Sequence, residues 1–288
     1  MNKNLSFALL MIFIFGCGFL IWDNYTSSFL PDELLKPIKT KKTNSTPIKE
    51  EQPETQFPVP KIQDVTKPKS VQPETTEQPE SPEEDLQEDP PLPELDQSDQ
   101  PLKDTLSDFI PAQQLAELFS FDNVIRHFTT TIDGATSPKL PRKFSFAHHP
   151  EGKFLTTEAD TDQRYLIDEK NYDRYSGFVH LIEDTEVNHI VYVYVQFYPL
   201  IQKAYEELGY PNDYFNDRLV NIIDHVLATP DVPGKIELTK PKVFYQFADP
   251  NLENLSASQK LLLRIGFKNA VKVKKKLKEL KLALTHLR

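Results

Sequence analysis

Cysteine and glycine are scarce in this chain. Its 288 residues include one cysteine, Cys17, and eight glycines. One cysteine excludes an intramolecular disulfide and a zinc site built on several cysteines. Gly-x-Gly occurs only at residues 16–18 and Gly-x-Ser-x-Gly is absent, so the phosphate-cradling loop, the dinucleotide fingerprint and the hydrolase nucleophile elbow are all missing. We expect no cofactor, no metal and no nucleic-acid partner.

Charge is missing from residues 5–22, which read LSFALLMIFIFGCGFLIW. This run is at the short end of what spans a hydrocarbon core of about 30 Å, and Trp22 suits the interface. Residues 1–22 are therefore interpreted as a transmembrane anchor. Two alternatives remain open, a lipoprotein signal ending at Cys17 and a cleaved signal peptide. Lysines within residues 36–42 oppose export by the positive-inside rule, whereas the short amino-terminal flank favours it. We expect a single-pass inner-membrane protein with a periplasmic domain.

Residues 23–100 contain no glycine and many prolines. Residues 50–100 hold 15 acidic residues and 3 lysines, a net charge of −12, whereas residues 101–288 carry −1. Such a composition buries too little apolar surface to offset its ordering entropy. The sequence predicts a disordered Pro/Glu-rich tether that would reach about 240 Å if fully extended.

Residues 101–288 read as a mostly α, multi-helix globular domain with one small β-hairpin. Helical spacing of apolar residues begins near residue 115 and resumes at Val124, with Ser120 and Asp122 as the expected caps. Residues 154–157 and 164–167 flank an acidic turn and form the expected hairpin. Residues 187–208 are rich in β-branched and aromatic side chains, yet their 3-4 spacing predicts a helix, kinked or restarted at Pro199.

The carboxy-terminal segment has the cleanest helical pattern. Its apolar seam consists of Ala270, Val273, Leu277, Leu280, Leu284 and Leu287, and the helix carries a charge of +7 with eight basic residues and one acid. Lys272, Lys275 and Lys276 represent its basic face. The favoured interpretation is a seam packed on the domain with solvated lysines, and the alternatives are an anionic polymer or lipid headgroups, or a partner helix.

A helix predicted over 213–228 carries the candidate functional residues. They are Asp213, Asp217, Arg218, Asn221, Asp224 and His225. Asp213, Asp217, Asn221 and Asp224 share one stripe at i, i+4, i+8 and i+11. Such a surface suits a cation, a polar polymer or acid-base chemistry. In the plainer interpretation, Asp213 caps the helix, Arg218 pairs with a carboxylate, and the others are solvated or bonded to adjacent loops. His148 and His149, in a predicted loop, are interpreted as surface residues.

Two long stretches carry a family resemblance. They read AYEELGYPNDYFNDRLVNIIDHVLATP at 204–230 and FYQFADPNLENLSASQKLLLRIGFKNA at 244–270, with LPELDQSD at 92–99 and NYDRY at 171–175. Together they resemble a bacterial family of membrane-anchored proteins known as a domain of unknown function, catalogued as three-thousand-and-fourteen. The resemblance covers roughly 92–285. It implies one amino-terminal anchor and a proline-rich spacer, and it brings no known activity or functional residues.

The combined pattern favours a non-enzymatic interaction or scaffold domain, anchored in the bacterial envelope and held off the inner membrane. The membrane contact is residues 5–22, and the expected partner is an envelope protein or polymer. The alternative is a cell-wall-directed enzyme that uses Asp217, Asp224 and His225. A concave acidic pocket with perturbed titrating groups would favour the enzyme, and a convex patch of exposed aromatic residues would favour the binding domain.

Overall fold

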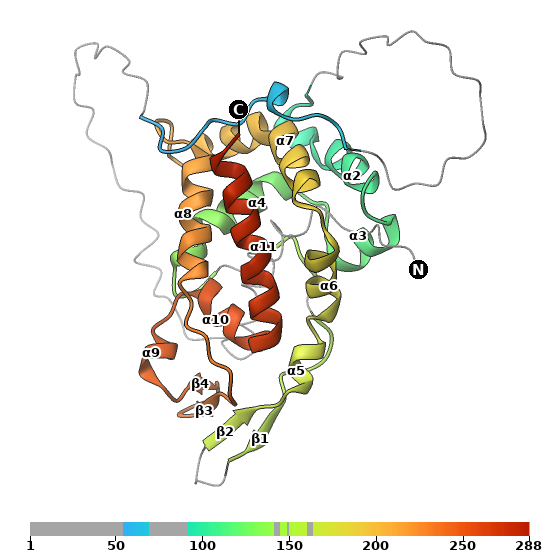
Figure 1. Ribbon diagram of the computed structural model, residues 1–288. Helices are drawn as coiled ribbons and strands as arrows, with labels where there is room; N and C mark the ends of the chain where they lie inside the picture. The colour runs from blue at the N-terminus through green and yellow to red at the C-terminus, as the bar shows by residue number, and fades with distance from the viewer. Residues whose placement is uncertain (1–53, 69–91, 141–144, 149, 160–163, 288) are drawn as a thin grey trace, which may run out of the picture.

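The computed structural model describes residues 54–68, 92–140, 145–148, 150–159 and 164–287. The predicted anchor and the remainder of the predicted tether lie outside these ranges. Among the described residues, none of the helices has both the length and the apolar character needed to cross a membrane. Figure 1 shows a helical bundle with a small sheet at one end and residues 54–68 running across the other end.

The described residues form ten α-helices, three 3-10 helices and four strands. The α-helices are α2 (Asp99–Ser107), α3 (Ala112–Leu118), α4 (Val124–Asp133), α5 (Lys170–Asp173), α6 (Ser176–Asp184), α7 (Val187–Glu207), α8 (Phe215–Leu227), α9 (Pro250–Glu253), α10 (Ala257–Arg264) and α11 (Phe267–Thr285). The 3-10 helices are η3 (Ile62–Asp64), η4 (Leu95–Gln97) and η5 (Gly134–Thr136). The strands are β1 (Thr156–Glu158), β2 (Arg164–Ile167), β3 (Glu237–Thr239) and β4 (Gln246–Phe247). The mostly helical class is confirmed.

Helix α7 is the centre of the bundle. Thirteen of its 21 residues are buried, among them Tyr194, Val195 and Phe197. It packs against α2, α4, α8 and α11. A helix that is apolar nearly all round is stable only when it is enclosed in this way. The helical prediction for 187–208 is thus confirmed. A restart at Pro199 is not observed, because burial of so many side chains outweighs the loss of one helical hydrogen bond, about 3 kcal/mol.

Helix α11 packs its seam onto the same core, as predicted. Ala270, Val273, Leu277, Leu280 and Leu284 are all buried, and the helix lies against α6, α7 and α8. Leu287 is half-buried and packs on the same cluster. The spacing of 3 and 4 therefore identified the buried face of this helix correctly.

The sheet is larger than the single predicted hairpin. Strands β1 and β2 pair antiparallel with Thr157 opposite Leu166, as the hairpin prediction requires. Strand β3 adds to β2, and β4 adds to β3, giving the antiparallel order β1-β2-β3-β4. Strands of three and two residues are too short to show a period of two, so β3 and β4 were missed. Ile167, Ile236, Leu238, Phe247 and Leu263 form a small core against the sheet.

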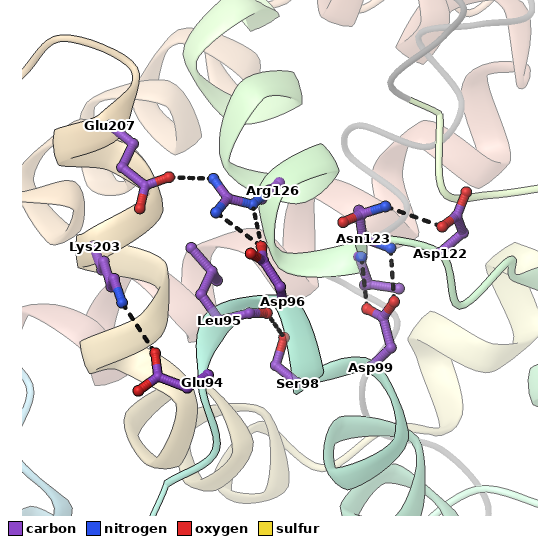
Figure 2. A network of polar contacts seen from close by, with 11 residues as sticks. Glu94, Leu95, Asp96, Ser98, Asp99, Asp122, Asn123, Arg126, Lys203 and Glu207 are labelled. Carbon is purple, nitrogen blue, oxygen red and sulfur yellow. Dashed lines mark hydrogen bonds and ion pairs between the residues drawn. The ribbon is translucent and has the colours of Figure 1, made fainter.

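Residues 92–99 belong to the helical domain and not to the predicted tether (Figure 2). Leu95 and Ser98 are buried. The Asp99 carboxylate accepts the backbone N–H groups of Asn123 and Val124 at 2.7 and 2.9 Å, and so caps α4. This replaces the predicted caps Ser120 and Asp122, because Asn123 adopts the left-handed conformation and turns these amides toward α2.

Two ion pairs hold the same stretch on α4 and α7, and a third joins these two helices to each other. The Arg126 guanidinium donates to Asp96 at 2.9 and 3.0 Å and to Glu207, and Lys203 pairs with Glu94 at 3.4 Å (Figure 2). Exposed ion pairs each contribute little, roughly 0–1 kcal/mol. Together with buried Leu95 they place the start of the domain before residue 101.

Residues 54–68 also differ from the predicted disordered tether. Phe57, Val59 and Val65 pack, half-buried, on the main core, and Pro60 is buried. Helix η3 lies against α7, and Lys67 pairs with Asp108 at 2.9 Å. We call residues 54–68 the strap. The apolar residues of the strap are spread among prolines and charges, so average composition hides them.

The buried face of α8 provides a test of the core. Leu219 is fully buried, whereas Asn221 on the same helix is exposed. We expect Leu219→Ala to lower the free energy of unfolding by about 2–5 kcal/mol. The matched control Asn221→Ala should change it by roughly 0.5 kcal/mol or less. Urea unfolding of the full-length protein in detergent measures both, and equal effects of the two substitutions would contradict this packing.

Candidate functional site

The candidate residues on α8 do not face one common space. Asp213 lies before the helix and is exposed, and it does not cap α8 with its side chain. The start of α8 is held instead by Gln202 of α7, whose amide oxygen accepts the Phe215 N–H at 2.9 Å and whose amide nitrogen donates to the Asp213 carbonyl at 2.9 Å. Asn221 is exposed.

The side chain of Asp217 binds the backbone of the strap. Its carboxylate accepts the N–H of Gln56 and the N–H of Phe57, both at 2.9 Å. The neighbouring Asn216 is fully buried, and its amide nitrogen donates to the Pro58 carbonyl at 2.8 Å. The Asn216 side-chain oxygen accepts the Tyr194 hydroxyl at 3.1 Å. A continuous polar line therefore runs from the middle of α7 through α8 to the strap.

Arg218 forms an internal ion pair, as the plainer interpretation predicts. It contacts the Asp133 carboxylate at 3.1 Å and donates to the Asp133 carbonyl at the end of α4. The Tyr210 hydroxyl donates to the same carboxylate at 3.2 Å. Burial, and then the charge of Asp133, raise the pKa of the Tyr205 phenol to about 12. This corner joins α4, α7 and α8.

Asp224 and His225 point toward two other elements. Both Asp224 oxygens accept from Lys281 of α11 at 2.7 Å. His225 shares a 2.8 Å hydrogen bond with the Ser256 hydroxyl, next to the start of α10. Burial, and then the positive charge of Arg218, lower the pKa of the His225 imidazole. The four ionisable side chains of α8 therefore contact four different elements. Asp217 contacts the strap, Arg218 contacts α4, Asp224 contacts α11, and His225 contacts the residue that caps α10.

The basic residues of α11 fall into two groups. Lys272 pairs with Glu183 at 2.7 Å, Lys274 with Asp231 at 2.6 Å, and Lys276 donates to the Thr185 carbonyl and lies 3.7 Å from Glu279.

The outward side of α11 carries five exposed residues, which are Lys268, Val271, Lys275, Lys278 and Leu282. We call these five residues the outer stripe. Within the described part of the chain its lysines have no ion-pair partner.

The outer stripe combines charge with apolar surface. Val271 and Leu282 remain 46% and 63% exposed. The spacing 268, 271, 275, 278 and 282 repeats the 3-4 pattern of the buried seam on another face of α11, so these side chains form one line. Lys275 was among the residues predicted for a basic face, whereas Lys272 and Lys276 serve mainly to join α11 to α6 and its following turn.

A surface cleft of about 600 Å³ lies where α5, the 233–235 loop and the start of α11 meet. Its charged lining includes Glu169, Lys170, Asp173, Lys235 and Lys268. Because both signs of charge are present, the lining favours no single ligand charge. Among the described residues, no cluster of three or more His, Cys, Asp or Glu side chains has the arrangement of a metal site. His148 bonds through its ring to the Glu117 carbonyl at 2.9 Å, and His149 lies outside the described residues.

Residue spacing predicted Asp217 as a candidate but did not predict its partner, the strap. Asn216 was also missed, because a buried asparagine between apolar neighbours has no distinctive spacing. The available signal was the sequence Phe57-Pro58-Val59-Pro60, an apolar run inside an acidic tract. An apolar run inside a spacer indicates a segment that packs on a folded domain.

The lowered pKa of His225 generates a pH prediction. In the unfolded chain the pKa of His225 lies near its ordinary value of 6.5, so the unfolded chain binds a proton more readily than the folded chain. The stability associated with neutral His225 is therefore retained above pH 6.5 and lost as pH falls through that value. We expect His225→Gln to lose less stability than the unmodified protein between about pH 7.5 and about pH 5.5. Urea unfolding at both pH values checks this, with His180→Gln on the exposed side of α6 as the control. An unchanged pH dependence in His225→Gln would contradict the prediction.

Comparison with known proteins places the helical domain in a family. No curated protein and no solved structure matches the chain. A family described as "Protein of unknown function (DUF3014)" matches residues 124–281, from the start of α4 into α11. This match covers more than half of the 288 residues and includes both stretches on which the resemblance was based. The chain belongs to the DUF3014 family.

Proposed function

We propose that this chain is an interaction domain of the bacterial envelope, held to the inner membrane by residues 5–22 and facing the periplasm. The observation that carries the proposal is the docking of the strap on α7 and α8 through Asp217 and Asn216. The strap belongs to the same proline-rich tract that follows the apolar run. Tension on that tract would therefore be transmitted to the domain from Glu54 onward, through the contacts of the strap with α7 and α8.

Docking of the strap sets the distance at which the domain works. The 31 residues from 23 to 53 separate the apolar run from the strap. Fully extended, they reach about 96 Å. This limit is much shorter than the 240 Å of a tether that ends at residue 100. The domain is thereby held at a distance suited to a partner between the inner membrane and the cell wall.

The outer stripe is the surface we assign to the partner. It presents three lysines without ion-pair partners in the described ranges, beside exposed Val271 and Leu282. Mixed basic and apolar surface suits an anionic, partly apolar contact on an envelope protein or polymer. The remaining four lysines of α11 contact Glu183, Asp231, Asp224 and, for Lys276, the Thr185 carbonyl and Glu279.

The enzyme alternative would require Asp217, Asp224 and His225 to act on one substrate. Their carboxylates and imidazole contact the strap, Lys281 and Ser256, respectively. A general acid and base must lie within hydrogen-bond reach of the same reacting group. The geometry therefore supports the interaction domain better than the enzyme.

Alkaline phosphatase fused after the last residue tests the topology. We expect activity in intact cells, because the domain is proposed to be exported and the enzyme is active only outside the cytoplasm. The parallel fusion to a reporter that is active only in the cytoplasm is the control. Activity of the cytoplasmic fusion alone would overturn the periplasmic assignment.

In-cell crosslinking tests the outer stripe. A photo-reactive amino acid in place of Lys275 or Lys278 should give a discrete adduct in intact cells, because both side chains are exposed. The matched control places it at Lys103 of α2, a half-exposed lysine away from α11. Equal yields from α2 and α11 would contradict a specific contact. Asp224→Asn should leave the yield of the adduct unchanged and should change the free energy of unfolding by roughly 0.5 kcal/mol or less. In the enzyme alternative, the same substitution would abolish activity.

A further inference from the structure

We infer that the face of α7 and α8 under the strap also accepts the strap of a second copy of this chain. The inference goes beyond the proposed function. It concerns residues 56–60, Asn216 and Asp217, and it does not involve the outer stripe.

Recognition at this site is directed mainly at the peptide backbone. Asp217 accepts two consecutive N–H groups, and Asn216 donates to the next carbonyl. The side chains of Phe57 and Val59 pack on the core, with Pro60 buried beside them. A segment that offers two N–H donors, a carbonyl and the Phe-Pro-Val-Pro side chains satisfies every one of these contacts. The strap of another copy satisfies them identically.

The strap is held weakly enough to exchange. Gln56 is exposed, Phe57, Val59 and Val65 are only half-buried, and Ile62 is 37% exposed. Each hydrogen bond contributes about 0.5–1.5 kcal/mol net, somewhat more to a charged group. Such contacts can break and re-form while α7 and α8 keep their packing against α4 and α11.

The connection between strap and domain is long enough to reach a neighbour. The 23 residues from 69 to 91 span at most about 71 Å when extended. A domain of about 190 residues has a radius of gyration of roughly 16 Å, so two domains in contact have centres about 40 Å apart. Exchange of an identical element between copies is a low-cost route to a dimer. Docking of a strap within its own chain is independent of the density of protein in the membrane. Docking on a second copy becomes more frequent as that density rises.

Isotope-mixed crosslinking of the full-length protein tests the exchange. Phe57 is replaced by a photo-reactive phenylalanine analogue, unlabelled and ¹⁵N-labelled copies are mixed in detergent, and the mixture is reconstituted into lipid vesicles at several densities. Mass spectrometry then reads each crosslink between the strap and α7 or α8. We expect mixed-isotope crosslinks whose share rises with density, toward about half if all straps dock on a second copy.

Variants assign these crosslinks to the site. Gln56→Pro removes one N–H donor to Asp217 and lies in the strap, so it leaves the helical core intact and should lower the crosslink yield severalfold. Asp217→Ala should do the same, and Asn221→Ala, exposed on α8, should not. Same-isotope crosslinks alone at every density would overturn the exchange and leave the proposed function standing. Crosslinks that persist in both Gln56→Pro and Asp217→Ala would overturn the site itself.

Discussion

The enclosure of α7 is the constraint on which the other features depend. A helix with thirteen buried residues among 21 must be covered on most of its sides, and α2, α4, α8 and α11 provide that cover. Tyr194 and Asn216 make one of the polar contacts in this interior, and their hydrogen bond fixes how α8 is rotated against α7. With that rotation set, the next residue, Asp217, turns to the rim where the strap lies.

Helix α11 shows how one helix serves two purposes. Its seam completes the cover of α7, and four of its lysines reach acidic side chains on other elements or on α11 itself. A strongly basic helix thereby packs on a domain whose remaining residues, 101–266, carry a charge of −8. What is left of its charge is concentrated in Lys268, Lys275 and Lys278, which share one line. The overall charge of +7 therefore overstates the charge that a partner would meet.

Sequence periodicity identified the long helices because burial repeats every three or four residues over many turns. The 187–208, 213–228 and carboxy-terminal segments all show this. Features that depend on residues far apart in sequence could not be predicted. Asp99 caps α4 from 24 and 25 residues away, Gln202 holds the start of α8, and Asp217 meets Gln56 across 161 residues. Each of these polar partners belongs to a different element, and no local spacing relates them.

The candidate site shows the same limit. The spacing predicted one polar stripe from Asp213 to Asp224, but Asp213 precedes α8 and the tertiary partners decide which of the groups remain available. A carboxylate that accepts two backbone N–H groups, as Asp217 and Asp99 both do, has its oxygens directed at fixed donors and stabilises a chain path. Asp99 begins α2 and holds the start of α4, whereas Asp217 lies on α8 and holds the strap. Each of these acidic residues therefore holds a chain segment in place, although composition had placed Asp99 in a solvated spacer and residue spacing had placed Asp217 on a candidate reactive surface.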